Sequence, residues 1–494
     1  MMEYDDLRGF LKLLESKKEL IRIKEPVNWD VEIGTISQES INQDGAAFIC
    51  ENIQGYTKTP CKKLVMNYLG NWKRVALAMG MPEDTPPGEM VSEWRKRDKQ
   101  LIKPVVVDKG PCKENILRGK DIDLSKFPIP KLHVRDGGRY ALTWHIVVTK
   151  DPDTGWMNVG TYRGMMLDKQ NIGMLLIPVQ NWGIHAQKYL KRKMPMPVSV
   201  ALGVDPVTMM TSATPYPAGV NEYDVIGAVR GKPMQLVKCE ANDLLVPANA
   251  ETVLEGEINM DPSTYRMEGP FGEYPGYYSS IDSTPKPVFN IKCITHRNDP
   301  IYTSGLIGCG PHLKAADCDY MGALTLSAIT WNQLEINSIP GIRDVWFDED
   351  VWGTNVFVSI DKKHYGHAKQ VAFAIWSAPS ANYIGKYVVV VDADIDIHNP
   401  KKVWAAIANR TDPSQDIIVV PQTNGGPLDP SVHPDMKMKT GKLGRWDRVL
   451  IDATWDDTWS ERPEWGGLTH PPSCLAQEGD LQVVKKKWKR YGFK

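Results

Sequence analysis

Five short runs in the middle of the chain decide its fold: ALTWHIVVTKD (141–151), WMNVGTYRGMML (156–167), VSVALGV (198–204), MQLVKCE (234–240) and FNIKCITHR (289–297). They are rich in β-branched and aromatic residues, and segments containing Gly or Pro separate them, which is typical of strands. Many short strands at close spacing indicate a sheet that closes into a barrel or packs as a sandwich. We therefore predict a β domain over residues 105–330, with its chemistry on strand ends and loops.

The flanking segments predict two further domains and a tail. Leu7, Phe10, Leu11 and Leu14 recur at helical spacing before an extended stretch, which indicates a small α+β domain over residues 1–104. Further on, the helical patterns 368–378 and 403–410 alternate with the apolar run YVVVVDADID (387–396). This alternation predicts a layered α/β domain over 331–455 with right-handed crossovers. The Trp- and Lys-rich residues 456–494 form either a solvated tail or a docking segment.

Composition narrows the class of protein. A chain of 494 residues exceeds the size of one hydrophobic core, so two or three domains are expected. The formal charge of -1 disfavours nucleic acid and anionic membranes as partners. The chain has no apolar run of the ~20 residues needed to cross a bilayer, and its start is too charged for a signal peptide, so we expect a cytoplasmic protein.

The cysteines are scattered and form no CxxC pair, which argues against a zinc cage and against a disulfide framework. We expect reduced, mostly buried thiols. The eight positions are Cys50, Cys61, Cys112, Cys239, Cys293, Cys309, Cys318 and Cys474.

The run 156–167 places an amide, Asn158, five residues before a guanidinium, Arg163. Side chains alternate between the two faces of a regular strand, so an odd separation puts these groups on opposite faces. Either Gly160 introduces a bulge, or the two groups serve different layers of one site.

The segment Glu268-Gly-Pro-Phe-Gly-Glu273 carries two carboxylates in a loop, because its Gly and Pro residues preclude a regular helix. Such a loop can turn both carboxylates into one pocket, where their mutual repulsion suits one of them to proton delivery. An acidic surface turn is the alternative interpretation.

His185 and Glu222 offer an imidazole and a further carboxylate. Together with the amide oxygen of Asn158 they would suit Mn2+ or Mg2+ better than a thiolate-seeking metal. A structural role for His185, beside Trp182, is the alternative.

These motifs occur in an order that resembles the UbiD family of prenylated-FMN-dependent decarboxylases, over most of residues 5–455. The order is Asn-x4-Arg, His, Asn-Glu-Tyr leading to Gly-Ala-x-Arg-Gly, VPANAETVLEGEI and EGPFGEYPGYY, followed by YVVVVDADIDIHNPKKVWAAIANRTDP and VLIDATW. The resemblance implies that the central domain is a split β-barrel of the flavin-reductase type that binds the cofactor.

The resemblance also implies roles for single residues. Asn158, His185 and Glu222 would ligate a divalent metal, and the backbone of Val159 and Gly160 would pass close to the flavin. Arg163, Glu268 and Glu273 would perform the chemistry, with Arg163 orienting the substrate carboxylate and Glu273 donating the proton. Arg448 aligns with a basic cofactor contact of some relatives.

The implied activity is reversible, non-oxidative decarboxylation of an aromatic or α,β-unsaturated acid, because a cofactor must take up the electrons that departing CO2 leaves behind. The implied cofactors are prenylated FMN and Mn2+ or Mg2+, with K+ as a further cation. The implied partners are the acid, CO2 or bicarbonate, a flavin prenyltransferase that supplies the cofactor, and other copies of the chain in a homodimer or homohexamer. Two alternatives are an FMN-dependent oxidoreductase on a related split barrel and a subunit of a multi-component aryl carboxylase.

Overall fold

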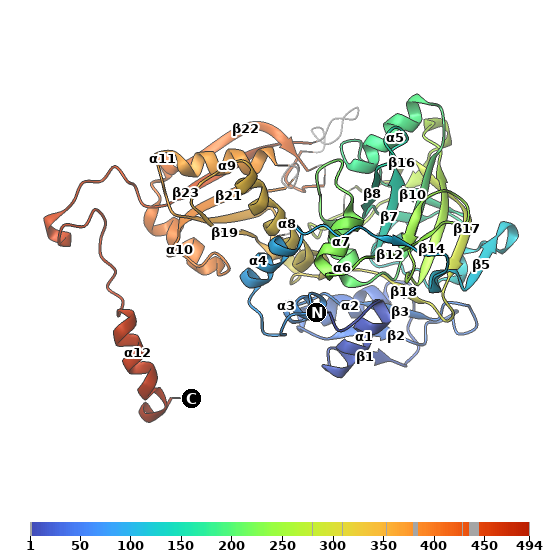
Figure 1. The fold of residues 1–494 in the computed structure, drawn as a ribbon, viewed down its shortest axis with the longest axis horizontal. Coiled ribbons are helices and arrows are strands. Elements are labelled where there is room, and N and C mark those ends of the chain that lie inside the picture. Colours follow the sequence, from blue (N-terminus) through green and yellow to red (C-terminus); the bar gives the residue numbers. More distant parts are fainter. Residues whose placement is uncertain are drawn as a thin grey trace.

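The computed structural model describes residues 2–278, 280–308, 310–351, 353–378, 384–426, 428–433 and 444–493. An N-terminal domain, a central sheet and a C-terminal α/β domain follow one another along the chain (Figure 1). This architecture confirms the predicted fold class. No helix in the described ranges is long and apolar enough to cross a membrane. Cys309 lies outside those ranges; six of the other cysteines are buried free thiols and Cys474 is exposed.

The N-terminal domain begins with the predicted amphipathic helix, α1 (Leu7–Ser16), which buries the four apolar side chains at helical spacing. The Asp6 carboxylate caps it by accepting from the amide of Gly9 at 2.8 Å. Its sheet has the order β1 (Leu20–Ile23), β2 (Ala47–Cys50), β3 (Lys63–Met66), β18 (Ile301–Thr303). The last strand comes from the middle of the chain and therefore ties this domain to the central one. Its other helices are α2 (Glu32–Asn42), α3 (Trp72–Ala78) and α4 (Pro87–Arg97).

The central domain is a curled sheet with edge strands β6 and β8, so within the described residues it stays open. Its order is β6 (Tyr140–Leu142), β9 (Gly164–Met166), β10 (Asn171–Met174), β17 (Val288–His296), β14 (Thr252–Ile258), β11 (Met196–Leu202), β7 (His145–Lys150), β8 (Met157–Gly160), with β5 (Asn115–Arg118) on β17. Surrounding it are α5 (Asn181–Lys191), α6 (Pro206–Ala213), α7 (Glu222–Arg230) and the hairpin β15 (Arg266–Glu268) and β16 (Thr284–Lys286).

One of the five predicted runs lies outside this sheet. Residues 234–240 contain β12 (Gln235–Lys238), which pairs with β13 (Leu245–Pro247) and with β4 (Val105–Val106) in a small separate sheet. The prediction of a strand in this run is confirmed, but strand propensity does not specify which strand pairs with it.

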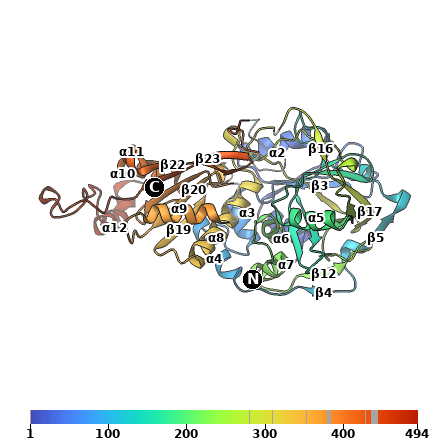
Figure 2. The ribbon, with the colours of Figure 1, turned by 90° about the horizontal axis from the view of Figure 1, so that it is seen from above.

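The C-terminal domain has a mixed sheet of order β19 (Ile342–Phe347), β20 (Asn355–Ile360), β21 (Tyr387–Asp392), β23 (Gly444–Ala453), β22 (Ile417–Gly425). The pairs β20–β21 and β21–β23 are parallel, as alternation of strands and helices predicts. Its helices are α9 (His367–Ser377), α10 (Pro400–Arg410) and α11 (Pro413–Asp416). The long helix α8 (Asp317–Ile336) lies between this domain and the central sheet (Figure 2).

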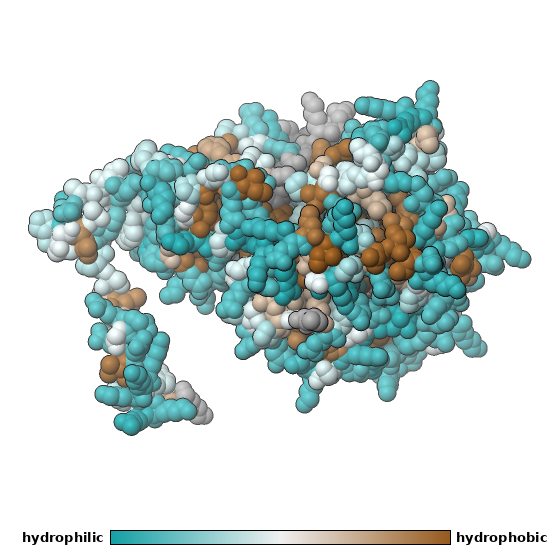
Figure 3. All heavy atoms as spheres, in the orientation of Figure 1, coloured by the Kyte–Doolittle hydropathy of each residue, from teal (hydrophilic) through white to brown (hydrophobic). Residues whose placement is uncertain are grey.

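The tail extends away from the body and ends in α12 (Glu478–Lys487) (Figure 1). Figure 3 shows isolated apolar side chains on it among polar ones. Leu475 and Val483 are exposed there, at 78% and 53%. The tail is therefore solvated along its length, and a docking role stays a prediction.

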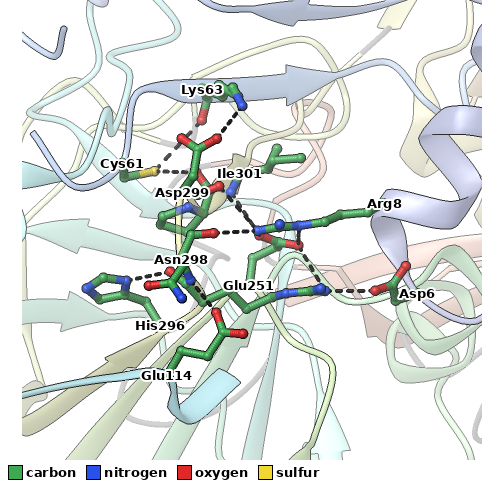
Figure 4. Close-up of polar contacts among 12 residues, drawn as sticks. Asp6, Arg8, Cys61, Lys63, Glu114, Glu251, His296, Asn298, Asp299 and Ile301 are labelled. Atoms are coloured by element: carbon green, nitrogen blue, oxygen red, sulfur yellow. Dashed lines mark hydrogen bonds and ion pairs between the residues drawn. The ribbon is translucent and has the colours of Figure 1, made fainter. Parts of the chain in front are cut away.

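A buried carboxylate connects the N-terminal domain to the central sheet (Figure 4). Glu251, fully buried just before β14, accepts from Nε and Nη2 of Arg8 on α1, both at 2.7 Å. It also accepts from the amide of Ile301, which opens β18, at 3.0 Å, and Arg297 lies 3.3 Å away. We call this cluster the Glu251 clamp.

Glu251→Gln should lower the free energy of unfolding by about 2 kcal/mol, because two arginines lose a buried counter-charge. Lys63→Ala is the matched control, since it breaks a neighbouring ion pair with Asp299 whose side chains are 30% and 53% exposed. That loss should stay below about 1 kcal/mol. Urea unfolding followed by tryptophan fluorescence measures both; equal midpoints for the two variants would contradict the clamp.

Candidate active site

A cavity of about 320 Å³ lies between the open edge of the central sheet, α8 and the C-terminal domain. Cavities of this size hold small ligands in proteins. Most of its lining surface is apolar, and its charged lining residues are Arg163, Glu222 and Glu273. The central domain contributes residues 142–145, 158–163, 175, 177, 179–181, 209, 212–216, 222, 271, 273, 274 and 307, α8 contributes 318, 321, 322, 325 and 326, and the C-terminal domain contributes 384 and 428.

Arg163 pairs with two carboxylates at the wall of this cavity. Its Nε and Nη2 donate to Oε1 and Oε2 of Glu268, each at 3.1 Å, and its Nη1 contacts Oε1 of Glu273. The side chains of Arg163, Glu268 and Glu273 are 11%, 0% and 5% exposed. Arg163 and Glu273 both line the cavity. Glu268 is not among the described residues that line it, so it lies behind Arg163. One guanidinium thus holds one carboxylate at the back and meets another at the surface of the cavity.

The loop from Glu268 to Glu273 turns both carboxylates towards Arg163. Strand β15 ends at Glu268, and Gly269 adopts a left-handed φ of 95° that favours glycine. The amide of Gly272 donates to Oδ1 of Asp136 at 3.0 Å, and the amide of Gly137 donates to the carbonyl of Pro270 at 2.8 Å. These contacts with residues 136–137 hold the loop against the start of β6, which follows at Tyr140.

Of the two alternatives for residues 158–163, the bulge at Gly160 is wrong. Strands β7 and β8 pair in continuous register from Val147–Gly160 to Lys150–Met157, and β8 ends at Gly160. Arg163 lies beyond the strand, so the alternation of side chains does not constrain it. Asn158 and Arg163 therefore line the same cavity without a bulge.

Asn158, His185 and Glu222 lie close together behind the end of β8. The amide of Val159 donates to Oε2 of Glu222 at 2.9 Å. Nδ1 of His185 is 2.9 Å from Oγ1 of Thr149, the residue paired with Asn158 across β7 and β8. Asn158 and Glu222 line the cavity; His185, fully buried, does not.

These three residues fit a cation. Within the described part of the chain, Nε2 of His185 has no hydrogen-bond partner. Burial lowers the pKa of His185 to about 4, so the ring is neutral and Nε2 can offer a lone pair. Burial raises the pKa of Glu222 to about 8, opposed by backbone N–H groups. A carboxylate without a cationic partner, an imidazole and an amide oxygen form a donor set for Mn2+ or Mg2+.

The other predicted cofactor contacts divide into two groups. Val159 and Gly160 line the cavity, and a Cβ at Gly160 would lie 2.3 Å from the Tyr162 hydroxyl. Arg448, on β23, is buried; its Nη2 donates to the carbonyl of Asn424 at 3.2 Å. It is not among the described residues that line the cavity, so its contact with a cofactor stays a prediction.

Sequence reasoning missed residues that support this wall. The hydroxyl of Tyr140 donates to Oε1 of Glu268 at 2.7 Å, and its ring packs on Phe271 with centroids 4.1 Å apart. His145 lines the cavity, and its Nε2 is 3.0 Å from the carbonyl of Tyr162. Both belong to the quoted run 141–151 or adjoin it, but nothing in its pattern of residues sets them apart from core side chains.

Sequence models of one family's three domains match the chain in order. They are the N-terminal domain, the Rift-related domain and the C-terminal domain of 3-octaprenyl-4-hydroxybenzoate carboxy-lyase, matched at residues 11–94, 103–311 and 319–453. Together they cover most of the chain.

Relatives of known activity are similar over nearly their whole length. A phenolic acid decarboxylase of Sedimentibacter hydroxybenzoicus is 33% identical over 483 residues, covering 95% of each chain. The structure of vanillic acid decarboxylase from the same organism, in closed form, matches with a TM-score of 0.86 and 32% identity, covering 99% of each chain. An evolved dimeric form of HmfF from Pelotomaculum thermopropionicum, a UbiD-class enzyme in complex with prFMN, matches with a TM-score of 0.79 and 27% identity, covering 98% of this chain and all of that one.

Gly137→Ala should displace the loop that carries Glu268 and Glu273, because a Cβ at residue 137 would lie 1.9 Å from the carbonyl oxygen of Gly269. Gly138→Ala is the matched control, since a Cβ there meets only the flexible side chain of Met165, at 3.1 Å. Amide hydrogen exchange over the loop should rise in the first variant and stay at the wild-type rate in the second. Unchanged exchange in Gly137→Ala would show that residues 136–137 do not hold the loop.

Proposed function

Because the chain belongs to the UbiD family of carboxy-lyases, we propose that it is a reversible, non-oxidative decarboxylase of an aromatic or α,β-unsaturated acid that uses prenylated FMN. Phenolic acids are the first candidates, since relatives at about one third identity act on them. The observation that carries the proposal is the pairing of Arg163 with Glu273 at the cavity surface and with Glu268 behind it.

Arg163 would bind the substrate carboxylate. A planar guanidinium offers parallel N–H donors that match a carboxylate, which a lysine offers only as a point charge. Glu268 already occupies Nε and Nη2, and the buried Nη1 contacts Glu273, so a substrate carboxylate would take the place of the Glu273 carboxylate on Nη1. Glu268 therefore serves to orient the guanidinium, and the substrate meets its other edge.

Glu273 would supply the proton that replaces CO2. Its side chain lines the cavity beside Arg163. Its backbone amide is already engaged, because it donates to the carbonyl of Tyr277 at 3.0 Å. The amide contact fixes the backbone from which the carboxyl group extends. A general acid placed in this way contributes about 10²- to 10⁴-fold to a rate.

Bound in the cavity beside Val159 and Gly160, the flavin would supply an electron sink for the bond to CO2. Asn158, His185 and Glu222 would hold a divalent cation, whose task is to fasten the cofactor's phosphate rather than to activate water. The mostly apolar lining would limit the water around the reacting groups. We further propose that a flavin prenyltransferase supplies the cofactor and that the chain works as a homodimer or homohexamer.

The direct test is to co-express the chain with a flavin prenyltransferase, record its visible spectrum and mass, and assay CO2 release from a panel of phenolic and other aromatic acids. The proposal predicts bound prenylated flavin and turnover of at least one acid. A chain that binds unmodified FMN and is reduced by a nicotinamide cofactor would instead be an oxidoreductase. Turnover that requires a second polypeptide would make it a subunit of a larger carboxylase.

Glu273→Gln should keep the fold and the flavin and lower kcat by about 10²-fold or more, because the amide cannot donate a carboxyl proton. Glu257→Gln is the control, since that carboxylate is 42% exposed and pairs with Lys292 on the outer surface of the sheet. Single-turnover CO2 release from flavin-loaded protein measures both. Wild-type turnover by Glu273→Gln would remove Glu273 from the role of proton donor.

Glu222→Gln should weaken Mn2+ binding by about 100-fold or more, because the site loses its anionic ligand. The matched control is Glu255→Gln: this buried carboxylate also accepts from backbone amides, of Glu240 and Ala241 at 2.6 and 2.7 Å, but does not line the cavity. Electron paramagnetic resonance of Mn2+ added to cofactor-free protein gives the affinities. Equal affinity for both variants would place the cation elsewhere.

A further inference from the structure

We propose that Tyr140 is a positioning residue for the reaction: its hydroxyl keeps Glu268 ionised on Arg163, so that the proton shared by the two carboxylates resides on Glu273. The inference rests on the proposed function of the site. In this role Tyr140 provides the third hydrogen bond to Glu268 and acts through Glu268, without contacting the substrate or the cofactor.

Both carboxylate oxygens of Glu268 accept hydrogen bonds. Oε1 accepts from the Tyr140 hydroxyl at 2.7 Å and from Nε of Arg163 at 3.1 Å, and Oε2 accepts from Nη2 of Arg163 at 3.1 Å. The Tyr140 hydroxyl is also 3.3 Å from the carbonyl of Pro270, a longer and weaker contact. Tyr140 is fully buried, so water does not compete for these bonds.

The ring of Tyr140 fixes the direction of its hydroxyl. It packs on Phe271, whose own ring lies 5.3 Å from the Arg163 guanidinium carbon. Tyr140, Phe271 and Met165 form a small apolar cluster separate from the main core. Tyr140 therefore bonds to Glu268 through its hydroxyl and packs on the ring that lies beside the Arg163 guanidinium.

The donors are distributed unequally between the two carboxylates. Glu268 accepts three hydrogen bonds from two side chains, whereas the contact of the Glu273 carboxylate is with Nη1 of Arg163. Hydrogen bonds donated to a carboxylate favour its charged form. Burial and the charge of Glu268 raise the pKa of Tyr140, so the phenol keeps its proton and acts as a donor. When one proton is available to the pair, Glu273 is the site that holds it.

Two other charged groups, of opposite sign, lie near Glu268, Arg163 and Tyr140. Lys286, half-buried on β16, interacts with both Glu268 and Arg163, and burial lowers its pKa. Asp136, near Tyr140, is engaged by the amides of Gly272 and His133, each at 3.0 Å. Both groups remain in place in a variant that changes only the hydroxyl of Tyr140, so that variant isolates its effect.

Tyr140→Phe tests the inference, because it keeps the ring on Phe271 and removes the hydroxyl. Tyr302→Phe is the matched control: it removes an equally buried hydroxyl, which donates to the carbonyl of Ala141 at 2.5 Å. In flavin-loaded enzyme with an acid that the wild type decarboxylates, Tyr140→Phe should lower kcat about tenfold with flavin content and KM unchanged. The Glu268 carboxylate then loses a hydrogen-bond donor, so the acid limb of the kcat–pH profile should move to higher pH.

A second readout needs no cofactor. In the infrared spectrum of the cofactor-free chain, Glu273→Gln should remove a protonated-carboxyl band from the wild type. In Tyr140→Phe with Glu273 intact the band should appear at a different frequency, because the proton then resides on Glu268, whereas Tyr302→Phe should leave the frequency unchanged.

Two results would overturn the inference. One is a Tyr140→Phe enzyme with the wild-type kcat and acid limb, or with changes that Tyr302→Phe reproduces. The other is a carboxyl band in Tyr140→Phe at the same frequency as in the wild type. Failure of the proposed function is distinct, since the wild type itself would then bind no prenylated flavin and release no CO2.

Discussion

Arg163 carries one positive charge into a wall where two carboxylates, Glu268 and Glu273, are both almost fully buried. Burying an uncompensated charge is costly, so a group of one cation and two anions must find a further proton or counter-charge. Lys286 stands nearby but is itself poorly solvated. The excess charge is relieved most simply by a proton on the carboxyl group that has fewer donors, and that group faces the cavity. The same constraint would thus provide the proton donor that we propose for the reaction.

A single strand, β8, connects this wall with the residues proposed to bind a cation. Strand β8 carries Asn158, and three residues after its end the chain reaches Arg163. The amide of Val159, between them, holds Glu222. The loop with Glu268 and Glu273 is held from the other side by residues 136–137, just before β6. A cofactor bound along β8 would therefore lie between the group that fastens its phosphate and the groups that handle the substrate.

Local sequence patterns predicted much of the fold and part of the candidate site. Apolar spacing predicted α1, alternation of strands and helices predicted the C-terminal sheet, and Gly and Pro predicted that the segment 268–273 is a loop. Local patterns failed where distant contacts decide. Residues 234–240 have strand propensity but join another sheet, and β8 ends before the alternation rule could apply to Arg163. Tyr140 and Glu268 lie 128 residues apart in sequence, so only the folded chain reveals their hydrogen bond.

Neutron diffraction from the deuterated, flavin-loaded enzyme with an unreactive aromatic acid tests the central claim most directly, because it locates the protons of the wall. The account predicts a deuteron on the carboxyl group of Glu273, a bare Glu268 that accepts from Arg163, and the ligand carboxylate on the Arg163 edge beside Glu273. A deuteron on Glu268, or a ligand carboxylate that does not contact Arg163, would contradict it.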